Sequence, residues 1–392
     1  MSEPRADGAA ARRWLIARVG FAQLVAFGST YYLPAVLAQS VARDLGVPAA
    51  ASFAGLSAAL VVSGFLGPAV GRYVDRHGGR LPLTLSNLVF AAGLAIHAAA
   101  QGPVVLGLAW LVMGVGMALG YYETAFAALA RLYGASARGQ IAGVTLIAGL
   151  TSTVSWPLTA WMDAHVGWRL ACLIWAAVNL IVALPLNLSV PKPTGARTPL
   201  ADRDEEPDEA GSSKRAMIAL AVMYAATSFV ASGLSSTLPT VLGHVGIDAT
   251  TAIWASTLLG PAQVVGRLAE VGWLGRYHPI VSASVACAFL PLGVAAFAIW
   301  GPGGVAAFAI LFGIGNGLLT IARGTLPLAL FGPRGYGRRV GVLTAPSRVT
   351  GAVAPLLMGL MTDAIGAAGL VVAAALNVVG LVALAFIRRE RH

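Results

Sequence analysis

Long apolar runs, separated by short polar loops, make up most of this chain. A helix that spans a membrane needs about 20 mostly apolar residues, and the runs reach this length. They are rich in Ala, Gly and Leu and show no alternation of apolar and polar positions, which argues against membrane β-strands. We therefore predict an all-α membrane protein with twelve transmembrane helices. These helices are expected at residues 14–38, 50–70, 81–100, 103–132, 139–162, 167–190, 215–242, 249–270, 279–299, 303–331, 337–362 and 365–387.

A polar segment at residues 191–213 interrupts this pattern between the sixth and seventh predicted helices. It contains prolines, Gly195 and an acidic run at 202–209, and it has almost nothing to bury. Such a composition predicts a solvated linker. The expected organisation is an N-terminal six-helix bundle at 1–190, the linker, and a C-terminal six-helix bundle at 214–392.

Composition supports a membrane protein and excludes other classes. Hydrophobic residues make up 57% of the chain, charged residues only 11%, and the mean hydropathy is +0.78. A soluble protein would be about 25% charged, and so little charge also excludes a disordered chain. The two cysteines, Cys172 and Cys287, lie in apolar runs and have no metal-ligand spacing, so we expect no disulfide scaffold, metal site or cofactor.

The distribution of basic residues predicts the orientation. The net charge is +10, and nearly all Lys and Arg lie in the two tails, the central linker and alternate loops. Only Arg43 and Arg169 lie on the opposite face. Because Lys and Arg collect on the cytoplasmic side, both termini and the linker are predicted to be cytoplasmic, in a bacterial-type inner membrane. This topology explains the charge without a nucleic-acid partner. The polar segment 1–13 lacks the core of a signal peptide, so we expect the first helix to be retained.

The two predicted halves contain related patterns in the same order. Gly28 precedes a Leu-Pro-x-Val-Leu sequence, and Gly233 precedes the same sequence at the same spacing. Further matches pair Gly71-Arg72 with Gly266-Arg267, and the Gly-x-Gly of helix 103–132 with that of helix 303–331. Parallel repeats of this kind predict two halves related by an axis along the membrane normal.

The segment from Gly71 to Arg80 reads Gly-Arg-Tyr-Val-Asp-Arg-His-Gly-Gly-Arg. It resembles the G-x-x-x-D-R/K-x-G-R-R/K signature of the major facilitator superfamily, which lies between helices 2 and 3. A weaker copy follows helix 249–270. The resemblance implies a monomeric secondary transporter, and not an enzyme, whose two halves rock about a central site. A fainter similarity links the chain to the monocarboxylate and oxalate/formate porters, although their helix 1 motif is absent here.

The signature loop is the predicted gate. A carboxylate at the end of helix 50–70 can accept hydrogen bonds from a helix N-terminus and favour its positive dipole end. It can also pair with Arg131. The resemblance implies that this contact stabilises the outward-open state, whereas a loop that only sets topology is the alternative. The predicted gating residues are Gly71, Arg72, Asp75, Arg76, Arg80, Arg131, Arg267 and Glu270.

Glu123 is the one acidic residue deep inside an apolar run. A carboxylate in hydrocarbon is costly, so it must face the interior, form an ion pair or keep its proton. We therefore predict proton coupling or substrate contact for Glu123. A structural ion pair with Arg323 or Arg18 is the alternative.

Arg323 and Arg348 also lie within apolar runs. A guanidinium stays charged and binds carboxylates through two hydrogen bonds, so these residues favour an anionic substrate. The alternative for Arg323 is an ion pair with Glu123, and the alternative for Arg348 is hydrogen bonding to backbone carbonyls. Polar and aromatic residues on the helices that line the cavity in this superfamily complete the predicted site. The predicted substrate-binding residues are Gln23, Tyr31, Tyr32, Tyr121, Tyr122, Asn316, Thr320, Arg323 and Arg348.

The sequence thus predicts a transporter of a small, monocarboxylate-like organic anion that works by alternating access and is coupled to protons. The rival hypothesis is a proton-driven exporter of drugs or amphipathic metabolites, which would use Glu123 to bind cations. A receptor or assembly factor that does not transport is a third hypothesis, and the intact signature loop argues against it.

Overall fold

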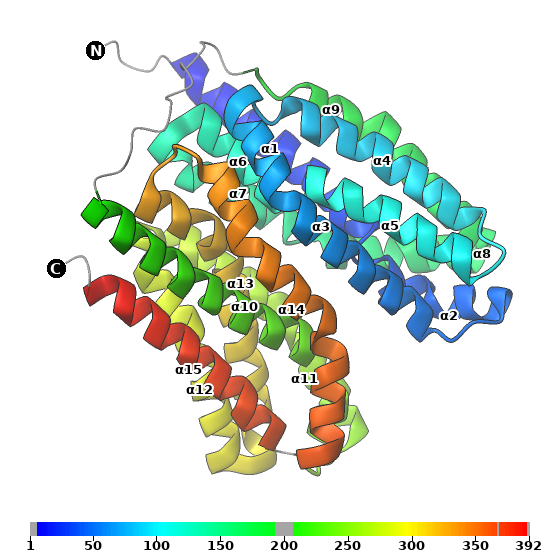
Figure 1. Ribbon diagram of the computed structural model, residues 1–392. Coiled ribbons are helices and arrows are strands. Elements are labelled where there is room, and N and C mark those ends of the chain that lie inside the picture. The colour runs from blue at the N-terminus through cyan, green and yellow to red at the C-terminus, as the bar shows by residue number, and fades with distance from the viewer. Residues whose placement is uncertain (1–5, 193–206, 367, 390–392) are drawn as a thin grey trace. The chain divides into compact units, whose positions relative to one another are not determined.

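The computed structural model describes residues 6–192, 207–366 and 368–389. These residues form helices joined by short turns, and no strand occurs among them. The α-helices are α1 Ala6–Ser29, α2 Leu33–Leu45, α3 Ala50–His77, α4 Arg80–Ala98, α5 Pro103–Gly120, α6 Tyr122–Tyr133, α7 Arg138–Ala148, α8 Thr151–Val178, α9 Leu184–Leu188, α10 Pro207–His244, α11 Ala249–Gly272, α12 Pro279–Trp300, α13 Val305–Phe331, α14 Tyr336–Ile365 and α15 Ala368–Arg389 (Figure 1). Short 3₁₀ helices occupy Gly134–Ala137, Leu274–Arg276 and Gly301–Gly304, and a π-helix occupies Asn179–Ala183.

Eight helical stretches within these ranges are long and apolar enough to cross a membrane. Some of them contain more than one predicted helix, and the stretch Pro103–Leu188 contains three. Within it, α8 consists of two helices that meet at a kink at Gly167, where the backbone is not helical. Gly167 has φ 78°, a left-handed conformation that favours glycine. The predicted loop at residues 163–166 is therefore the end of one half of α8, and this boundary is corrected.

Two of the predicted helices are broken in the middle. The helix expected at 14–38 divides into α1 and α2, with Pro34 in the first turn of α2, where the missing N–H of proline costs nothing. The helix expected at 103–132 divides into α5 and α6 at Tyr121, whose backbone is extended. Each break exposes a helix N-terminus inside an apolar run, a feature that transporters use to build binding sites.

The described residues form two compact units. Unit 1 comprises those within 1–195 together with 332–341, and unit 2 comprises those within 196–331 and 342–392. The start of α14 thus packs with unit 1, and the rest of α14 belongs to unit 2. The predicted domain boundaries at residues 190 and 214 remain a prediction.

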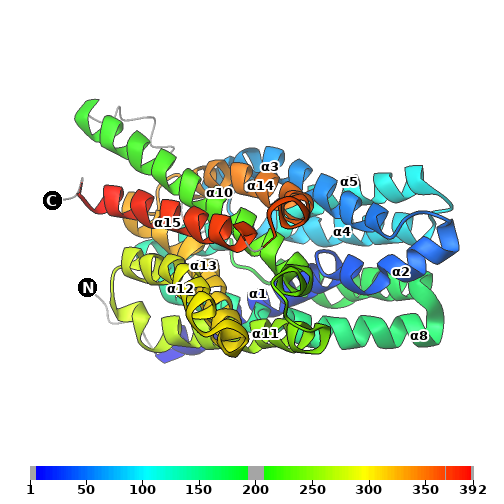
Figure 2. The same ribbon diagram turned by 90° about the horizontal axis from the view of Figure 1, so that it is seen from below.

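Unit 1 is organised around α4, which packs against α5 and α8. Figure 2 shows α4 and α5 side by side. Three buried asparagines hold α4 to the helical segment 179–188. Asn187 donates to the Asn87 side chain at 2.8 Å, Asn87 donates to Asn179 at 3.3 Å, and Asn179 donates to Ser29 at 3.0 Å. This chain of amides satisfies polar groups that water cannot reach.

Unit 2 is organised around α13, which packs against α11 and α12, while α10 packs along α15 (Figure 1). Glycines bring α11 and α13 close together. A Cβ on Gly266 would lie 2.3 Å from the Ile314 carbonyl oxygen, and a Cβ on Gly317 would lie 2.2 Å from that of Gln263. Larger side chains at these two positions would separate the helices, as is typical of membrane helix pairs packed through small residues.

Candidate functional site

The two helix breaks of unit 1 are joined to each other. The Gln23 side chain of α1 donates to the Gly120 carbonyl at the end of α5, at 2.6 Å. The Thr30 and Tyr121 hydroxyls, one from each break, are 2.7 Å apart and hydrogen-bonded. Gln23 and Tyr121 are almost completely buried, at 1% and 0% exposure. The structure therefore places two of the predicted substrate-binding residues where they hold the first and fourth predicted helices together.

Aromatic side chains surround this junction. The Phe27 ring stacks on Tyr121, with 4.0 Å between ring centroids, and lies 4.7 Å from the Tyr122 ring. Tyr31 and Tyr32 form an edge-to-face pair at 5.2 Å, and Tyr32 continues to Trp156 of α8 at 5.9 Å. Tyr31, Tyr32 and Tyr122 are half-buried. The structure thus gathers the four predicted tyrosines in one cluster, which we call the aromatic cluster together with Phe27 and Trp156.

Glu123 lies in the first turn of α6, directly after the break at Tyr121, and is half-buried. A helix N-terminus presents unpaired backbone N–H groups and a positive dipole end, which stabilise a nearby negative charge. This explains how the fold accommodates a carboxylate within an apolar run. The sequence identified the residue but gave no sign of the helix break that supports it.

Asp75 binds the start of α14 within unit 1. Its two carboxylate oxygens accept hydrogen bonds from the backbone N–H groups of Gly337 and Arg338, each at 2.8 Å. The positive charges of Arg131 and Arg339 act on the same carboxylate. The expected bond between this aspartate and a helix N-terminus is thus present, with both oxygens engaged. Its role in gating remains a prediction.

Glycines allow this contact. A Cβ on Gly71 would lie 2.1 Å from the Gly337 carbonyl oxygen, and a Cβ on Gly341 would lie 2.6 Å from that of Gly67. The backbones of α3 and α14 therefore touch directly. Arg72 and Arg76 are exposed, while Arg80 is half-buried. Of the signature residues, Gly71 and Asp75 thus make the contact, and Arg72 and Arg76 point to the surroundings of the protein.

Arg323 is held by two residues of α10 in unit 2. Its Nη2 donates to the Thr227 hydroxyl at 3.0 Å, and its guanidinium carbon lies 5.9 Å from the centre of the Tyr224 ring. The Tyr224 hydroxyl donates to the Arg323 backbone carbonyl. Arg323 is half-buried, whereas Thr227 and Tyr224 are buried at 1% and 0% exposure. The guanidinium is thus oriented by two buried partners.

Asn316, Thr320 and Arg323 follow one another along α13, and each is half-buried. The Thr320 hydroxyl donates to the Asn316 backbone carbonyl at 2.9 Å. Arg348 is half-buried in α14. The part of α14 that contains it is bound to α10, because the Thr350 hydroxyl donates to the Ala225 carbonyl at 3.1 Å. Both predicted arginines therefore belong to helices that bind α10.

Arg267 and Glu270, the weaker copy of the signature, are more buried than Asp75, at 7% and 1% exposure. They lie in the last turns of α11. The Arg267 guanidinium donates to the Gln263 side chain at 3.5 Å within the same helix. The copy is therefore part of the interior of unit 2, and its gating role remains a prediction.

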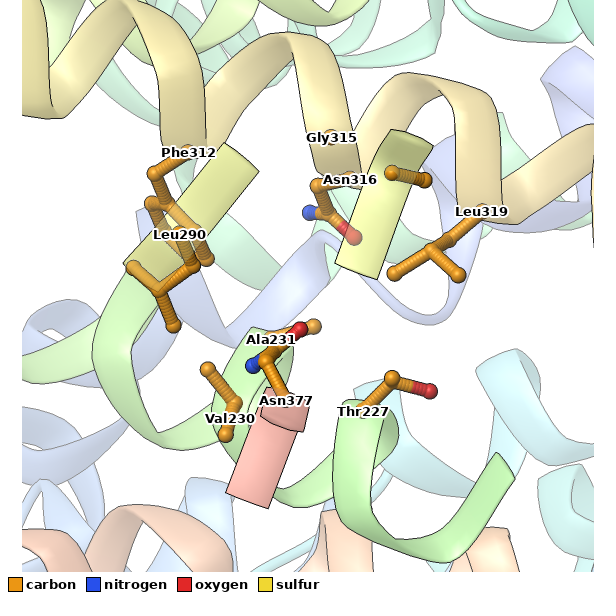
Figure 3. A pocket seen from close by; sticks show the side chains of 10 residues that line it. Thr227, Val230, Ala231, Leu290, Phe312, Gly315, Asn316, Leu319 and Asn377 are labelled. Carbon is orange, nitrogen blue, oxygen red and sulfur yellow. The ribbon is translucent and has the colours of Figure 1, made fainter. Parts of the chain in front are cut away.

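Two polar residues of unit 2 were missed by the sequence analysis. Thr227 orients Arg323, and Asn377 of α15 lines a small pocket together with Thr227 and Asn316 (Figure 3). Asn377 gave a detectable signal, because it is the one amide inside the last apolar run. Thr227 gave none, since a threonine in a membrane helix commonly bonds to its own backbone. Within the described ranges, no group of His, Cys, Asp and Glu could hold a metal ion.

Comparisons with known proteins point to a single family. A model of the family described as the Major Facilitator Superfamily matches residues 19–305. The chain is 27% identical over 386 residues to an uncharacterised 38 kDa protein in a 23S RNA operon of Thermoproteus tenax, covering 97% of this chain and 96% of that protein. It is 26% identical over 380 residues to an MFS-type efflux pump of Mycolicibacterium smegmatis, covering 90% and 87%.

Solved structures share the fold. The crystal structure of the human organic anion transporter MFSD10 (TETRAN) matches with a TM-score of 0.75 and 18% identity, over 95% of this chain and 99% of that chain. The crystal structure of the E. coli fucose:proton symporter FucP matches with a TM-score of 0.68 and 15% identity, over 95% and 97%. These similarities confirm the predicted all-helical membrane fold.

Proposed function

This chain belongs to the major facilitator superfamily, and from this premise we propose that it transports a small organic anion by alternating access, coupled to protons. The observation that carries the proposal is the position of Arg323. An arginine inside a membrane-spanning helix is costly and marks a functional site by default. Here its guanidinium is oriented by Thr227 and Tyr224 in a residue that is only half-buried, and a guanidinium binds a carboxylate through two hydrogen bonds.

Arg348, Asn316 and Thr320 of unit 2 supply further polar contacts to the anion in this proposal. A substrate-binding role for the half-buried Tyr31, Tyr32 and Tyr122 of unit 1 remains a prediction. Gln23 and Tyr121 act differently. Because their polar groups bond to Gly120 and Thr30, they position the aromatic cluster. The structural relative MFSD10 is described as an organic anion transporter, which agrees with an anionic substrate.

Glu123 is the proposed proton-coupling residue. It lies beside Tyr122 of the aromatic cluster and is half-buried at a helix N-terminus. In this proposal the carboxylate takes up and releases the coupled proton during the transport cycle. The structural relative FucP is described as a proton symporter.

Gating in this proposal depends on the two hydrogen bonds of Asp75, which hold the start of α14 and break when the transporter changes state. Arg131 supports this carboxylate, and Arg267 and Glu270 act at the related position of unit 2. The basic residues of the tails, the linker and alternate loops support an orientation with both termini in the cytoplasm. A monomer in a bacterial-type inner membrane is the further part of this proposal.

A second candidate is export of amphipathic compounds. The relative from Mycolicibacterium smegmatis is described as an efflux pump, and the aromatic cluster of unit 1 includes Tyr122, which directly precedes Glu123 in the chain. Aromatic rings bind organic cations through their faces. This candidate predicts that cationic dyes are transported and that Arg323 is not required.

One experiment separates the two candidates. The protein is reconstituted in liposomes under a pH gradient, and the uptake of organic acids and cationic dyes is measured. We expect saturable uptake of a small carboxylate, lost in Arg323→Ala and in Arg348→Ala. Arg18→Ala is the matched control, because Arg18 lies in an apolar run but is exposed. Transport of cationic dyes that persists in both arginine variants would contradict the proposal of anion transport and support export of amphipathic compounds.

Proton coupling is tested in the same liposomes with Glu123→Gln, which keeps the shape and removes the charge. We expect this variant to exchange the substrate between two equal pools but to lose accumulation driven by the pH gradient. Unchanged accumulation would remove Glu123 from the coupling role and leave the anion site intact.

A further inference from the structure

Unit 2 contains a small pocket between α10, α12, α13 and α15 (Figure 3). Its volume is about 10 Å³, close to the space that one water molecule requires. Most of the lining is apolar and includes Leu290 and Phe312. The polar lining residues are Thr227, Asn316 and Asn377, from three different helices. In the proposed transport function Asn316 contacts the anion and Thr227 orients Arg323, while Asn377 and the pocket itself have no role.

The two asparagines carry hydrogen-bonding groups that the rest of the described protein does not satisfy. The Asn377 side chain donates to the Ala373 carbonyl at 3.3 Å in its own helix, and its Oδ1 has no partner among the described residues. The side-chain amide of Asn316 also has none there. Figure 3 shows the two amides extending toward each other from opposite sides of the pocket. Asn377 is 3% exposed, so bulk water does not satisfy it.

We propose that this pocket binds one water molecule, held between the side-chain amides of Asn316 and Asn377. A buried polar group without a partner costs about 1–3 kcal/mol, whereas a bridging water restores the lost hydrogen bonds at little entropic cost. An apolar cavity of this size would stay dry, but a polar one with two or more partners holds water. The polar lining and the small volume of the pocket therefore favour a water molecule.

The water lies next to the group that orients Arg323. Thr227 lines the pocket, and the same hydroxyl accepts the hydrogen bond from Arg323 Nη2 at 3.0 Å. The polar region around the arginine thus extends from α10 through the bound water to α13 and α15. Polar surroundings of this kind lower the cost of a guanidinium inside the membrane.

Radiolytic hydroxyl-radical footprinting of the full-length protein tests this site, because radicals form from bound water and oxidise the side chains beside it. Phe312 lines the pocket, and Phe308 lies one turn away in the same helix, 6.4 Å between ring centroids. Both rings are buried, at 5% and 0% exposure. We expect Phe312 to be oxidised several-fold faster than Phe308. Equal rates would show that the pocket is dry and would overturn the proposal.

Substitutions then test the two amides. Asn377→Leu and Asn316→Leu are each expected to lower the oxidation rate of Phe312 to that of Phe308, because leucine fills the space and offers no hydrogen bond. Val378→Leu is the control, since this neighbouring position is 44% exposed. Oxidation of Phe312 that stays fast in both asparagine variants would also overturn the proposal. The comparison in the unsubstituted protein remains decisive if a variant fails to fold.

Discussion

At the scale of single residues, polar side chains in this protein are held mainly by backbone groups. Gln23 donates to the Gly120 carbonyl, Tyr224 donates to that of Arg323, and Asp75 accepts from the N–H groups of Gly337 and Arg338. Inside a membrane, water does not compete for these groups. A hydrogen bond to the backbone fixes a side chain relative to a helix, whereas a hydrogen bond to another side chain joins it to a group that can itself move. Positions that bind substrate or protons can therefore be oriented with few residues.

Thr227 gives the first prediction at this scale. Thr227→Val keeps the shape but removes the acceptor for Arg323, and a lost hydrogen bond to a charged group costs about 1.5–3 kcal/mol. We expect a lower Tm and a raised KM for the transported anion. Thr227→Ser retains the hydroxyl and is expected to restore both. A Val variant with unchanged KM would show that Thr227 does not orient the arginine for binding.

Asp75 gives the second prediction. Asp75→Asn removes the charge and one of the two acceptor oxygens that bind the start of α14, so we expect a severe loss of transport in liposomes. Asp248→Asn is the matched control. Asp248 caps α11 by accepting from the Thr251 N–H, and hydrogen bonds from Thr251 hold the pKa of this carboxyl below its usual value. Asparagine caps a helix as well as aspartate, so transport should persist in this control.

At the scale of elements, the helix breaks are the main feature that builds the site. The break between α1 and α2 has a local cause in Pro34, whereas at the break between α5 and α6 Tyr121 adopts an extended backbone without a proline. Their effect is tertiary, because Thr30 and Tyr121 bond across the two breaks and Phe27 stacks on Tyr121. The breaks in two separate helices are thus held together by one hydrogen bond and one ring stack.

This junction predicts a specific loss of stability. Tyr121→Phe keeps the ring stack and removes only the hydroxyl, so we expect about 1 kcal/mol of destabilisation, the usual net value of one hydrogen bond. The measurement is thermal unfolding in detergent. Tyr73→Phe is the control, because Tyr73 is 37% exposed in α3 and should show no shift. Equal effects of the two changes would mean that the Thr30–Tyr121 bond does not stabilise unit 1.

The contact of α3 with α14 predicts a steric effect. A Cβ on Gly71 would lie 2.1 Å from the Gly337 carbonyl oxygen, whereas a Cβ on Gly107 would have no atom within 4 Å. We expect Gly71→Ala to abolish the contact and strongly reduce transport. Gly107→Ala should be neutral or slightly stabilising, because alanine favours a helix by about 1 kcal/mol over glycine. Full transport by the Gly71 variant would contradict a gating role for this contact.

At the scale of the whole molecule, orientation in the membrane follows from the basic loops. The 26 Lys and Arg residues lie mostly in the tails, the linker and alternate loops, and such residues stay on the cytoplasmic side. The two native cysteines are fully buried, so they should not react with water-soluble labels. Cysteines introduced at other positions can therefore be labelled without a signal from the two native cysteines.

Cysteine labelling of intact cells tests this orientation. Ser136 and Gln101 are both exposed and lie in loops that we predict on opposite sides. We expect Gln101→Cys to react with an impermeant maleimide in intact cells, and Ser136→Cys to react only after the cells are opened. The reverse pattern would invert the proposed topology, and labelling of the unsubstituted protein would invalidate the method.

Much of this protein could be predicted from its sequence because the signals are local. The apolar runs, the polar linker and the spacing of the signature from Gly71 to Arg80 are properties of neighbouring residues, and they indicated the helical fold and the family. The candidate site was predicted as a set of residues, but not as an arrangement. Tyr121 illustrates the limit, since a tyrosine in an apolar run has the same sequence signal whether it faces a cavity or bonds to Thr30.

The sequence by itself determined the membrane environment, the helical class and the presence of charged residues such as Glu123 and Arg323 in apolar runs. The reason is that the length of an apolar run, and the free-energy cost of a charge within it, depend only on neighbouring residues. Only the tertiary structure decided what holds those charges. The breaks that place a helix N-terminus beside Glu123, the Thr227 hydroxyl that orients Arg323, and the amides of Asn316 and Asn377 that face one pocket depend on packing between distant segments. Such packing is a property of pairs of surfaces, which no single stretch of sequence contains.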